Sequence, residues 1–171
     1  TLVMGVLNIT EDSFSDGGLW LDPANAKAHG EAMMKDGADI IDIGAESTRP
    51  GAKRVSEEDE QTRVLSAVDA LIPEGAVLSI DTTRASVARM ALEHGAQIIN
   101  DVSGGRLDRE MPHVVAEHSE SLYIVQHWRG WLAGSAGDVP DADTSVYANG
   151  VVDDVYDELM KQVDDVLQAG V

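Results

Sequence analysis

The sequence predicts a parallel α/β fold, arranged either as a βα barrel or as a doubly wound sheet. Five short apolar runs alternate with segments of helical periodicity, and such nearly continuous apolar runs are typical of strands buried on both faces. Each run stops at a polar side chain. A weak internal repeat, GADIID at 37–42 and GAQIIN at 95–100, also indicates a recurring unit of helix end, buried strand and polar residue.

The first βα unit is predicted from an apolar run and a helix start. The run at 2–7 reads as a strand that ends at Asn8. After a segment rich in turn formers, Asp22 and Pro23 predict the N-cap and first position of a helix. That helix is expected to stop near Gly37.

The next units follow the same pattern. Ile40 to Ile43 reads as the second strand, and Ser56 with Asp59 three residues later predicts the cap of a helix that ends at Pro73. The third strand is expected at 77–80, and Thr83 is expected to cap the helix after it. The remaining elements are strands at 98–99 and 122–125, a short helix near 114–117 and a last helix with apolar residues from 152 to 166.

Composition favours one globular domain spanning residues 1–171, of which 43% are hydrophobic and 25% charged. No apolar run approaches the length of a membrane span and no signal peptide is visible, which fits a cytoplasmic protein without a membrane partner. The absence of cysteine excludes disulfides and thiolate metal sites. A net charge of −19 argues against a nucleic-acid partner, because phosphate contact needs a basic face.

Polar side chains stand where the predicted strands stop: Asn8, Asp42, Asp81, Asn100 and His127. In parallel α/β folds these strand ends gather on one face, and ligands bind there. A single such residue is more often a loop cap than a site residue, but five in the same position predict one shared site.

The segment after the second strand, GAESTRPG at 44–51, combines small residues with hydroxyl groups and a guanidinium. Small residues permit close approach, and the hydroxyl and guanidinium groups can donate to an anion. A surface loop with a stray arginine is the alternative interpretation of this stretch taken alone.

Five ordered motifs resemble the dihydropteroate synthase family. They are MGVLNITEDSFSDGG at 4–18, DIGAESTRPGA at 42–52, SIDTTRASVA at 79–88, INDVSGG at 99–105 and HWRG at 127–130. The resemblance implies a TIM (β/α)8 barrel. It also implies a transferase that joins p-aminobenzoate to a dihydropterin methyl pyrophosphate, giving dihydropteroate and pyrophosphate, and that is the target of sulfonamides.

The resemblance assigns roles to several residues. Asp81, Asn100 and Asp42 correspond to pterin-binding residues, and a carboxylate and an amide suit the donor-rich edge of a pterin. Thr48, Arg49 and His127 correspond to residues that engage pyrophosphate, although His127 could equally support the strand end. Asp81 and Arg49 are the expected catalytic residues, and Asn8 is the expected contact to Mg²⁺, the one cofactor implied.

The resemblance also implies a p-aminobenzoate pocket built by two loops. Phe14 and Asp16 in the first, and Ser47 and Pro50 in the second, match positions that line it. Phe14 is the single phenylalanine of the chain and has no apolar neighbour in sequence, although folding back onto the core is the alternative for it.

Length is the main departure from the family. A TIM barrel takes about 250 residues, whereas these 171 residues suit about five βα units and lack the family's later lysine and arginine-x-histidine motifs. The sequence is therefore expected to be a barrel truncated on its C-terminal side, inactive by itself, from a protein that forms a homodimer at full length.

Two alternatives to the synthase stay open. The first is a non-catalytic pterin-binding paralogue, weakly suggested by Glu11 and Ala45, where the family usually has proline and glycine. The second is the pterin-binding domain of a folate-dependent methyltransferase, which resembles the Asp and Asn strand ends. That domain should lack the SFSDGG and STRPG stretches present here.

Overall fold

The computed structural model describes residues 1–10, 22–46, 54–129 and 146–171. Its strands are β1 (Met4–Asn8), β2 (Ile40–Gly44), β3 (Leu78–Asp81), β4 (Ile98–Asp101) and β5 (Leu122–Val125). Its helices are α1 (Pro23–Lys35), α2 (Glu57–Leu71), the 3-10 helix η2 (Ile72–Glu74), α3 (Ala85–Glu93), α4 (Met111–Ala116) and α5 (Val151–Gln168). The predicted alternation of strands and helices is confirmed.

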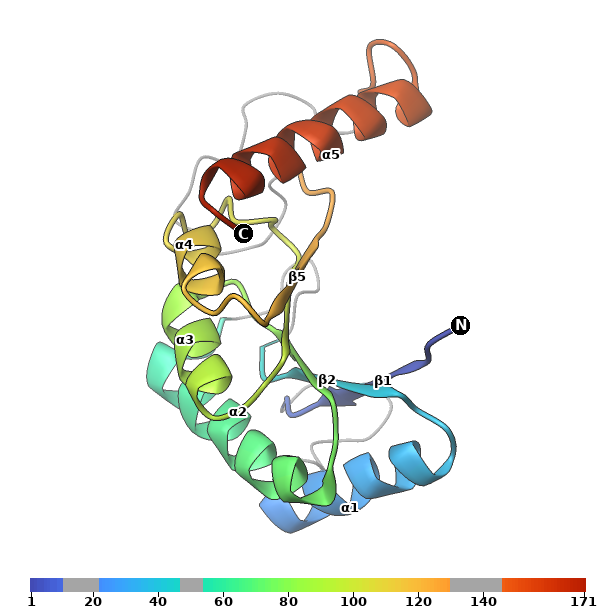
Figure 1. The fold of residues 1–171 in the computed structure, drawn as a ribbon. Coiled ribbons are helices and arrows are strands. Elements are labelled where there is room, and N and C mark those ends of the chain that lie inside the picture. Colours follow the sequence, from blue (N-terminus) through green and yellow to red (C-terminus); the bar gives the residue numbers. More distant parts are fainter. Residues whose placement is uncertain (11–21, 47–53, 130–145) are drawn as a thin grey trace.

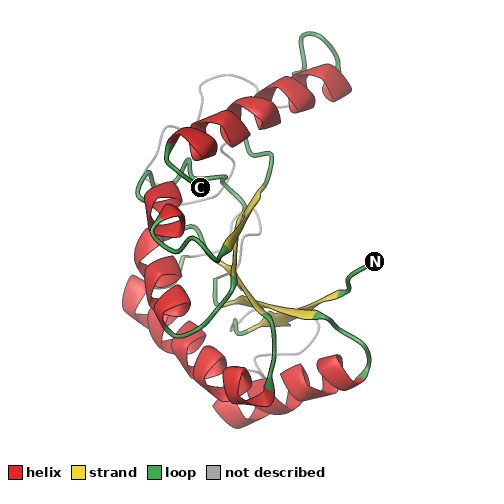
Figure 2. Cartoon of the chain, viewed as in Figure 1, coloured by secondary structure: helices red, strands yellow, loops and turns green. Residues whose placement is uncertain are grey.

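The five strands form one parallel sheet in the order β1-β2-β3-β4-β5. In a βα barrel, strands that follow one another in sequence lie side by side and are joined by helices. A doubly wound sheet instead reverses its strand order at a switch point. The sheet curves, and α1 to α4 lie along its convex side (Figures 1 and 2). The barrel alternative is therefore the one that the strand order supports.

The strands alternate between two faces because successive side chains of a strand point to opposite sides. Leu7, Ile43, Ile80 and Ile99 are paired in register across β1 to β4, and each is fully buried in the core beneath the helices. On the concave face, Val6 of β1 is 54% exposed. The helix-covered face thus holds the core, and the alternate side chains of each strand point to the concave face.

Local sequence explains where the helices begin and end. Asp22 caps α1 by accepting from the Ala24 amide, and Ser56 caps α2 by accepting from the Asp59 amide, as predicted. Gly37 and Gly95, the two glycines that open the internal repeat, have φ of 104° and 100°. This left-handed conformation suits glycine and ends α1 and α3 just before the next strand.

The prediction that Thr83 caps α3 is wrong. The N-cap position is Arg84, which makes no side-chain capping bond, and the Ala85 amide instead donates to Asp108 Oδ2 at 2.8 Å. Thr83 Oγ1 accepts from Arg54. A cap supplied from 23 residues away depends on tertiary structure, and spacing along the chain does not reveal it.

The last helix differs from α1 to α4 in how it packs. Its C-terminal end lies near α4, with Gly170 beside Ala116, while its first turns extend beyond the sheet (Figure 1). Val166 is buried, but Val152 is 80% exposed. The apolar stripe predicted for this helix is therefore buried only toward its C-terminal end.

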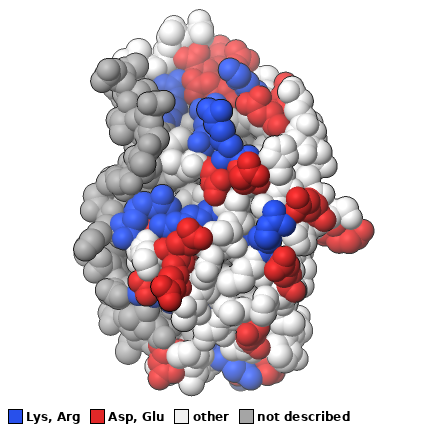
Figure 3. All heavy atoms as spheres, turned by 90° about the vertical axis from the view of Figure 1, so that its left-hand side faces the viewer, with Lys and Arg blue, Asp and Glu red and all other residues white. Residues whose placement is uncertain are grey.

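Charged side chains are scattered among uncharged residues on the helix-bearing side of the molecule. Figure 3 shows acidic and basic groups interspersed there rather than gathered by sign. Within the described part of the chain, no helix has both the length and the apolar character needed to cross a membrane.

Candidate functional site

The carboxyl ends of the strands bring predicted site residues into one row on the concave face. Register pairs Asn8 with Gly44, Gly44 with Asp81, and Asp81 with Asn100. A Cβ built on Gly44 would lie 3.2 Å from Asn8 Oδ1 and 3.5 Å from Asp81 Oδ2. Asn8 and Asp81 therefore approach each other across a position that has no side chain.

Asp42 lies one step deeper on the same face and is 5% exposed. Its Oδ1 accepts from Ser79 Oγ at 2.6 Å, and its Oδ2 accepts from Asn100 Nδ2 at 3.2 Å. Asn100 Oδ1 in turn accepts from Gln126 Nε2 at 2.7 Å. This chain of hydrogen bonds orients the Asn100 amide, and it shows that Gln126, treated in the sequence only as a departure from the family, supports the site.

Asp81 is the most perturbed acid of this face. Burial, together with the smaller effect of the nearby carboxylates Asp42, Asp101 and Glu46, raises the pKa of Asp81 to about 7. No hydrogen bond links its carboxylate to another described residue, so nothing among them offsets the lost hydration. A carboxylate that has lost hydration and has no such partner suits a ligand that brings its own hydrogen-bond donors.

Asn8 can supply one oxygen ligand to a hard cation, but not a complete coordination sphere. Its amide oxygen is the type of ligand that Mg²⁺ accepts, and its side chain is on the exposed end of β1. Within the described residues, no group of three or more His, Cys, Asp or Glu side chains is arranged to hold a metal ion. The residues therefore suit an ion that takes most of its ligands from phosphate and water.

Asp101, next to Asn100, points to the opposite face and is fully buried. Its carboxylate accepts from the Ser103 amide and hydroxyl, the Gly105 amide and the Tyr123 hydroxyl, each at 2.8 Å. Burial raises the pKa of this carboxyl although these bonds oppose the rise. Asp101 thus fixes the turn that follows Asn100.

A cluster of two arginines and two glutamates lies at the ends of β2 and β3, and sequence reasoning did not identify it. Arg54 contacts Glu46, while Arg84 contacts both Glu46 and Glu60. Glu46 is part of the GAESTRPG motif, but its partners are separated from it by 8 and 38 residues. Glu46 lies inside the motif and Arg54 lies three residues beyond its last glycine, so the motif itself does not indicate this pairing.

His127 is engaged by α5. Its Nε2 lies 2.8 Å from Glu158 Oε2, and Arg129, which stacks 3.7 Å from the Tyr147 ring centroid, also pairs with Glu158. The hydrogen bond from Arg129 is the main cause that lowers the pKa of Glu158 to about 2. His127 is thus held by Glu158, a residue outside the sequence motifs. No described hydrogen bond joins His127 to the row of Asn8, Asp81 and Asn100.

Replacing Glu158 with glutamine is expected to destabilise the protein in a pH-dependent way. Because the folded-state pKa is depressed from 4.5 to about 2, the carboxylate stabilises the fold fully above the higher value and loses this effect as the pH falls toward the lower one. The difference in free energy of unfolding between wild type and variant should therefore narrow from about pH 6 to about pH 3, as measured by urea unfolding. The exposed Glu93→Gln variant is the control, and a difference that does not change with pH would contradict this account.

Six predicted site residues lie outside the described residues: Phe14, Asp16, Ser47, Thr48, Arg49 and Pro50. The segments that carry them follow β1 and β2 at the carboxyl ends of those strands. Their assignments to p-aminobenzoate and pyrophosphate stay predictions.

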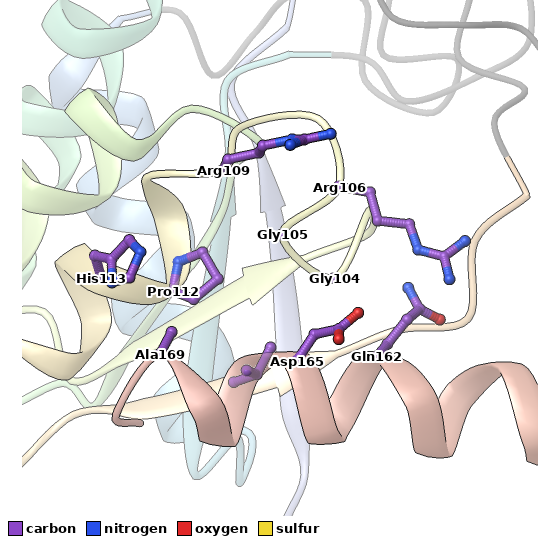
Figure 4. Close-up of a pocket in the computed structure, with 10 residues that line it drawn as sticks. Gly104, Gly105, Arg106, Arg109, Pro112, His113, Gln162, Asp165 and Ala169 are labelled. Atoms are coloured by element: carbon purple, nitrogen blue, oxygen red, sulfur yellow. The ribbon is translucent and has the colours of Figure 1, made fainter.

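A cleft of about 420 Å³ lies apart from this row, between the turn after β4 and helix α5. Its basic lining residues do not converge on one point, since Figure 4 shows His113 at the opposite end from Arg106. Arg106 donates to the Trp128 carbonyl at 3.2 Å. None of Asn8, Asp81 and Asn100 lines this cleft.

Known proteins are similar to this chain in sequence and in fold. The dihydropteroate synthase of Mycobacterium leprae is 47% identical over 169 residues, which are 99% of this chain and 57% of the relative. The Bacillus subtilis enzyme is 42% identical over 172 residues, 100% of this chain and 55% of the relative. The chain thus spans a little more than half the length of these relatives.

Solved structures of dihydropteroate synthases have a similar fold. Dihydropteroate synthase from Clostridium difficile, crystallised with pteroic acid, superposes with a TM-score of 0.83 at 34% identity, covering 100% of this chain and 60% of that one. The Yersinia pestis enzyme in complex with a sulfonamide drug gives 0.83 at 32% identity, with 99% and 58% covered. The resemblance read from the motifs is confirmed. Residues 4–171 match the model of the family described as pterin binding enzyme, and the chain belongs to that family.

Proposed function

We propose that the protein containing this chain is a dihydropteroate synthase. It condenses p-aminobenzoate with 6-hydroxymethyl-7,8-dihydropterin pyrophosphate and releases pyrophosphate and 7,8-dihydropteroate. The observation that carries the proposal is the row of Asp81 and Asn100 at adjacent strand ends. It is supported by relatives named dihydropteroate synthase and by the Burkholderia cenocepacia enzyme solved with 7,8-dihydropteroate.

Asp81 and Asn100 would recognise the pterin edge. A pterin presents ring N–H and amino donors together with acceptors, so a carboxylate can accept two bonds while an amide both donates and accepts. Asp42 would support this pair through its bond to Asn100. Because donors to a carboxylate favour its charged form, pterin binding is expected to lower the pKa of Asp81 from about 7 and to release a proton.

Breaking the carbon–oxygen bond to pyrophosphate builds negative charge on the leaving group, which needs cations and donors nearby. Thr48, Arg49 and His127 would supply these, with Asn8 as one ligand to Mg²⁺. When bound, the ion neutralises charge on the pyrophosphate oxygens. The attacking group is an aromatic amine that is already neutral near pH 7, so the reaction does not demand a strong general base.

Pyrophosphate release tests the proposal directly. The protein expressed from its gene is mixed with 6-hydroxymethyl-7,8-dihydropterin pyrophosphate and Mg²⁺, and release is measured with and without p-aminobenzoate. We expect release that depends on p-aminobenzoate. Pterin binding without release would instead support the non-catalytic paralogue, and methyl transfer from methyltetrahydrofolate would support the methyltransferase. A cytoplasmic location and a homodimer stay predictions.

A further inference from the structure

Asn100, the amide proposed to bind the pterin, lies in the middle of a chain of hydrogen bonds that runs from β2 to the end of β5. Asp42 Oδ1 accepts from Ser79 Oγ at 2.6 Å, and Asp42 Oδ2 accepts from Asn100 Nδ2 at 3.2 Å. On its other side, Asn100 Oδ1 accepts from Gln126 Nε2 at 2.7 Å. Both polar atoms of the Asn100 side chain are therefore engaged by neighbouring side chains.

The carboxylate of Asp42 gives this chain of hydrogen bonds one direction. A carboxylate is an acceptor at both oxygens, so the part of the Asn100 amide that faces Asp42 must be its NH₂ group. The carbonyl oxygen of Asn100 then faces Gln126, which must present its own NH₂ group. Among the described residues, Gln126 is the one that donates to this oxygen. The orientation of the Asn100 amide is thus fixed from both ends.

Gln126 is placed next to the proposed pterin-binding row. Register pairs Asn100 with Asp81 on one side and with Ile124 of β5 on the other. Side chains two residues apart in an extended chain point to the same face, so Gln126, which follows Ile124 by two residues, lies on the concave face with Asn100. Asn100 therefore stands between Asp81 and Gln126.

Helix α5 holds Gln126 in place through Gln162. The side chain of Gln162 is buried and extends from α5 toward the turn of Gly104 (Figure 4). Its Nε2 donates to the Ser103 carbonyl at 3.2 Å and to the Gln126 carbonyl at 3.3 Å. A Cβ on Gly104 would lie 2.7 Å from this nitrogen, so glycine leaves room for the contact. Gln162 thus joins the turn after Asn100 to the residue that orients Asn100.

We propose that Gln126 is a specificity-determining positioning residue, which fixes the Asn100 amide and thereby decides the hydrogen-bonding pattern that the pterin meets. The inference rests on the proposed pterin site. An amide oriented before binding has no second orientation to give up when the ligand arrives. A reversed amide would place a donor against a donor of the ligand, or an acceptor against an acceptor, and such a mismatch costs affinity.

Calorimetric titration with 6-hydroxymethylpterin tests the inference in the protein expressed from its gene. Gln126→Met removes the donor to Asn100 at similar side-chain length, and we expect the dissociation constant to rise about fivefold. Gln126→Glu keeps the shape but sets an acceptor against the Asn100 carbonyl oxygen, so we expect a rise of about twentyfold. Tighter binding by Gln126→Glu than by Gln126→Met would mean that shape matters and hydrogen-bond direction does not, which would overturn the inference.

Gln61→Met is the matched control. Gln61 donates to Glu57 on the exposed side of α2, so its replacement removes the same kind of side chain away from the strand ends. This variant is expected to bind 6-hydroxymethylpterin as tightly as wild type does. Equal losses of affinity in Gln61→Met and Gln126→Met would contradict a specific role for Gln126.

A double-mutant cycle separates positioning from direct contact. If Gln126 acts through Asn100, adding Gln126→Met to Asn100→Ala should raise the dissociation constant little further. Fully additive effects would mean that Gln126 contacts the pterin by itself, and the positioning role would be wrong.

Nuclear magnetic resonance supplies a readout that needs neither ligand nor turnover. The side-chain NH₂ signals of Asn100, identified by their loss in Asn100→Ala, should shift in Gln126→Met and stay in place in Gln61→Met. Shifted signals in a protein that binds no pterin would refute the proposed function while supporting the orientation of Asn100 by Gln126. Signals that stay in place in Gln126→Met, or shifted signals with unchanged pterin affinity, would refute the inference alone.

Discussion

Replacing Asp81 with asparagine is expected to lower kcat/KM for the proposed synthase reaction by about 10²–10³-fold, with weaker pterin binding. The change keeps the size of the side chain but turns one acceptor oxygen into a donor NH₂ group. That group would face the N–H donors of the pterin edge, and a buried donor facing a donor loses a bond and leaves both groups unsatisfied. Steady-state pyrophosphate release and calorimetric titration with 6-hydroxymethylpterin measure the two effects.

The same substitution is expected to stabilise the unliganded protein at alkaline pH. The pKa of Asp81 is raised from 3.8 to about 7 in the folded state, so the folded protein binds more protons than the unfolded chain between these values. Its contribution to stability is then complete below pH 3.8 and is lost as the pH rises through about 7. At about 1.4 kcal/mol per pKa unit, the free energy of unfolding falls by at most ~4 kcal/mol over this range.

Urea unfolding between about pH 5 and pH 8 checks this sign. Asp81→Asn should show a flatter pH dependence than wild type and greater stability at pH 8, while the exposed Asp157→Asn variant should follow wild type. If the Asp81→Asn variant loses pterin affinity, but its stability at pH 8 and its pH dependence of stability match wild type, then Asp81 serves binding and its burial does not cost stability. A variant with normal turnover would remove Asp81 from the proposed site.

Replacing Asp101 with alanine is expected to lower the free energy of unfolding by about 4 kcal/mol. The carboxylate is fully buried, and its removal leaves two amides and two hydroxyls without their acceptor. Each buried donor left unsatisfied costs about 1–3 kcal/mol, although relaxation of the turn recovers part of the sum. Chemical denaturation with an unchanged m-value measures the loss.

Tyr123→Phe is the matched control for Asp101→Ala. It removes one donor to the same carboxylate and keeps the ring, so a loss of about 1 kcal/mol is expected. Similar losses in the two variants would mean that water replaces Asp101 as acceptor, and that the turn after Asn100 does not depend on the carboxylate.

Sequence periodicity alone was sufficient to predict the order of the elements. The strands of this parallel sheet are mostly apolar, so each one is visible as a short run, and caps such as Asp22 and Ser56 act within three residues of themselves. The convergence of Asn8, Asp81 and Asn100 was also predictable, because the ends of parallel strands share one edge of a sheet. The family motifs added the chemistry to this geometry.

Contacts between side chains distant in sequence were decided only by the tertiary structure. Asp108 replaces Thr83 as the cap of α3, Glu158 holds His127, and Arg84 reaches Glu46 across 38 residues. The sequence by itself determined which backbone segments form strands and helices, since hydrophobic period and caps act locally. The structure decided which charges pair, because an arginine or glutamate suits many partners and only packing selects one.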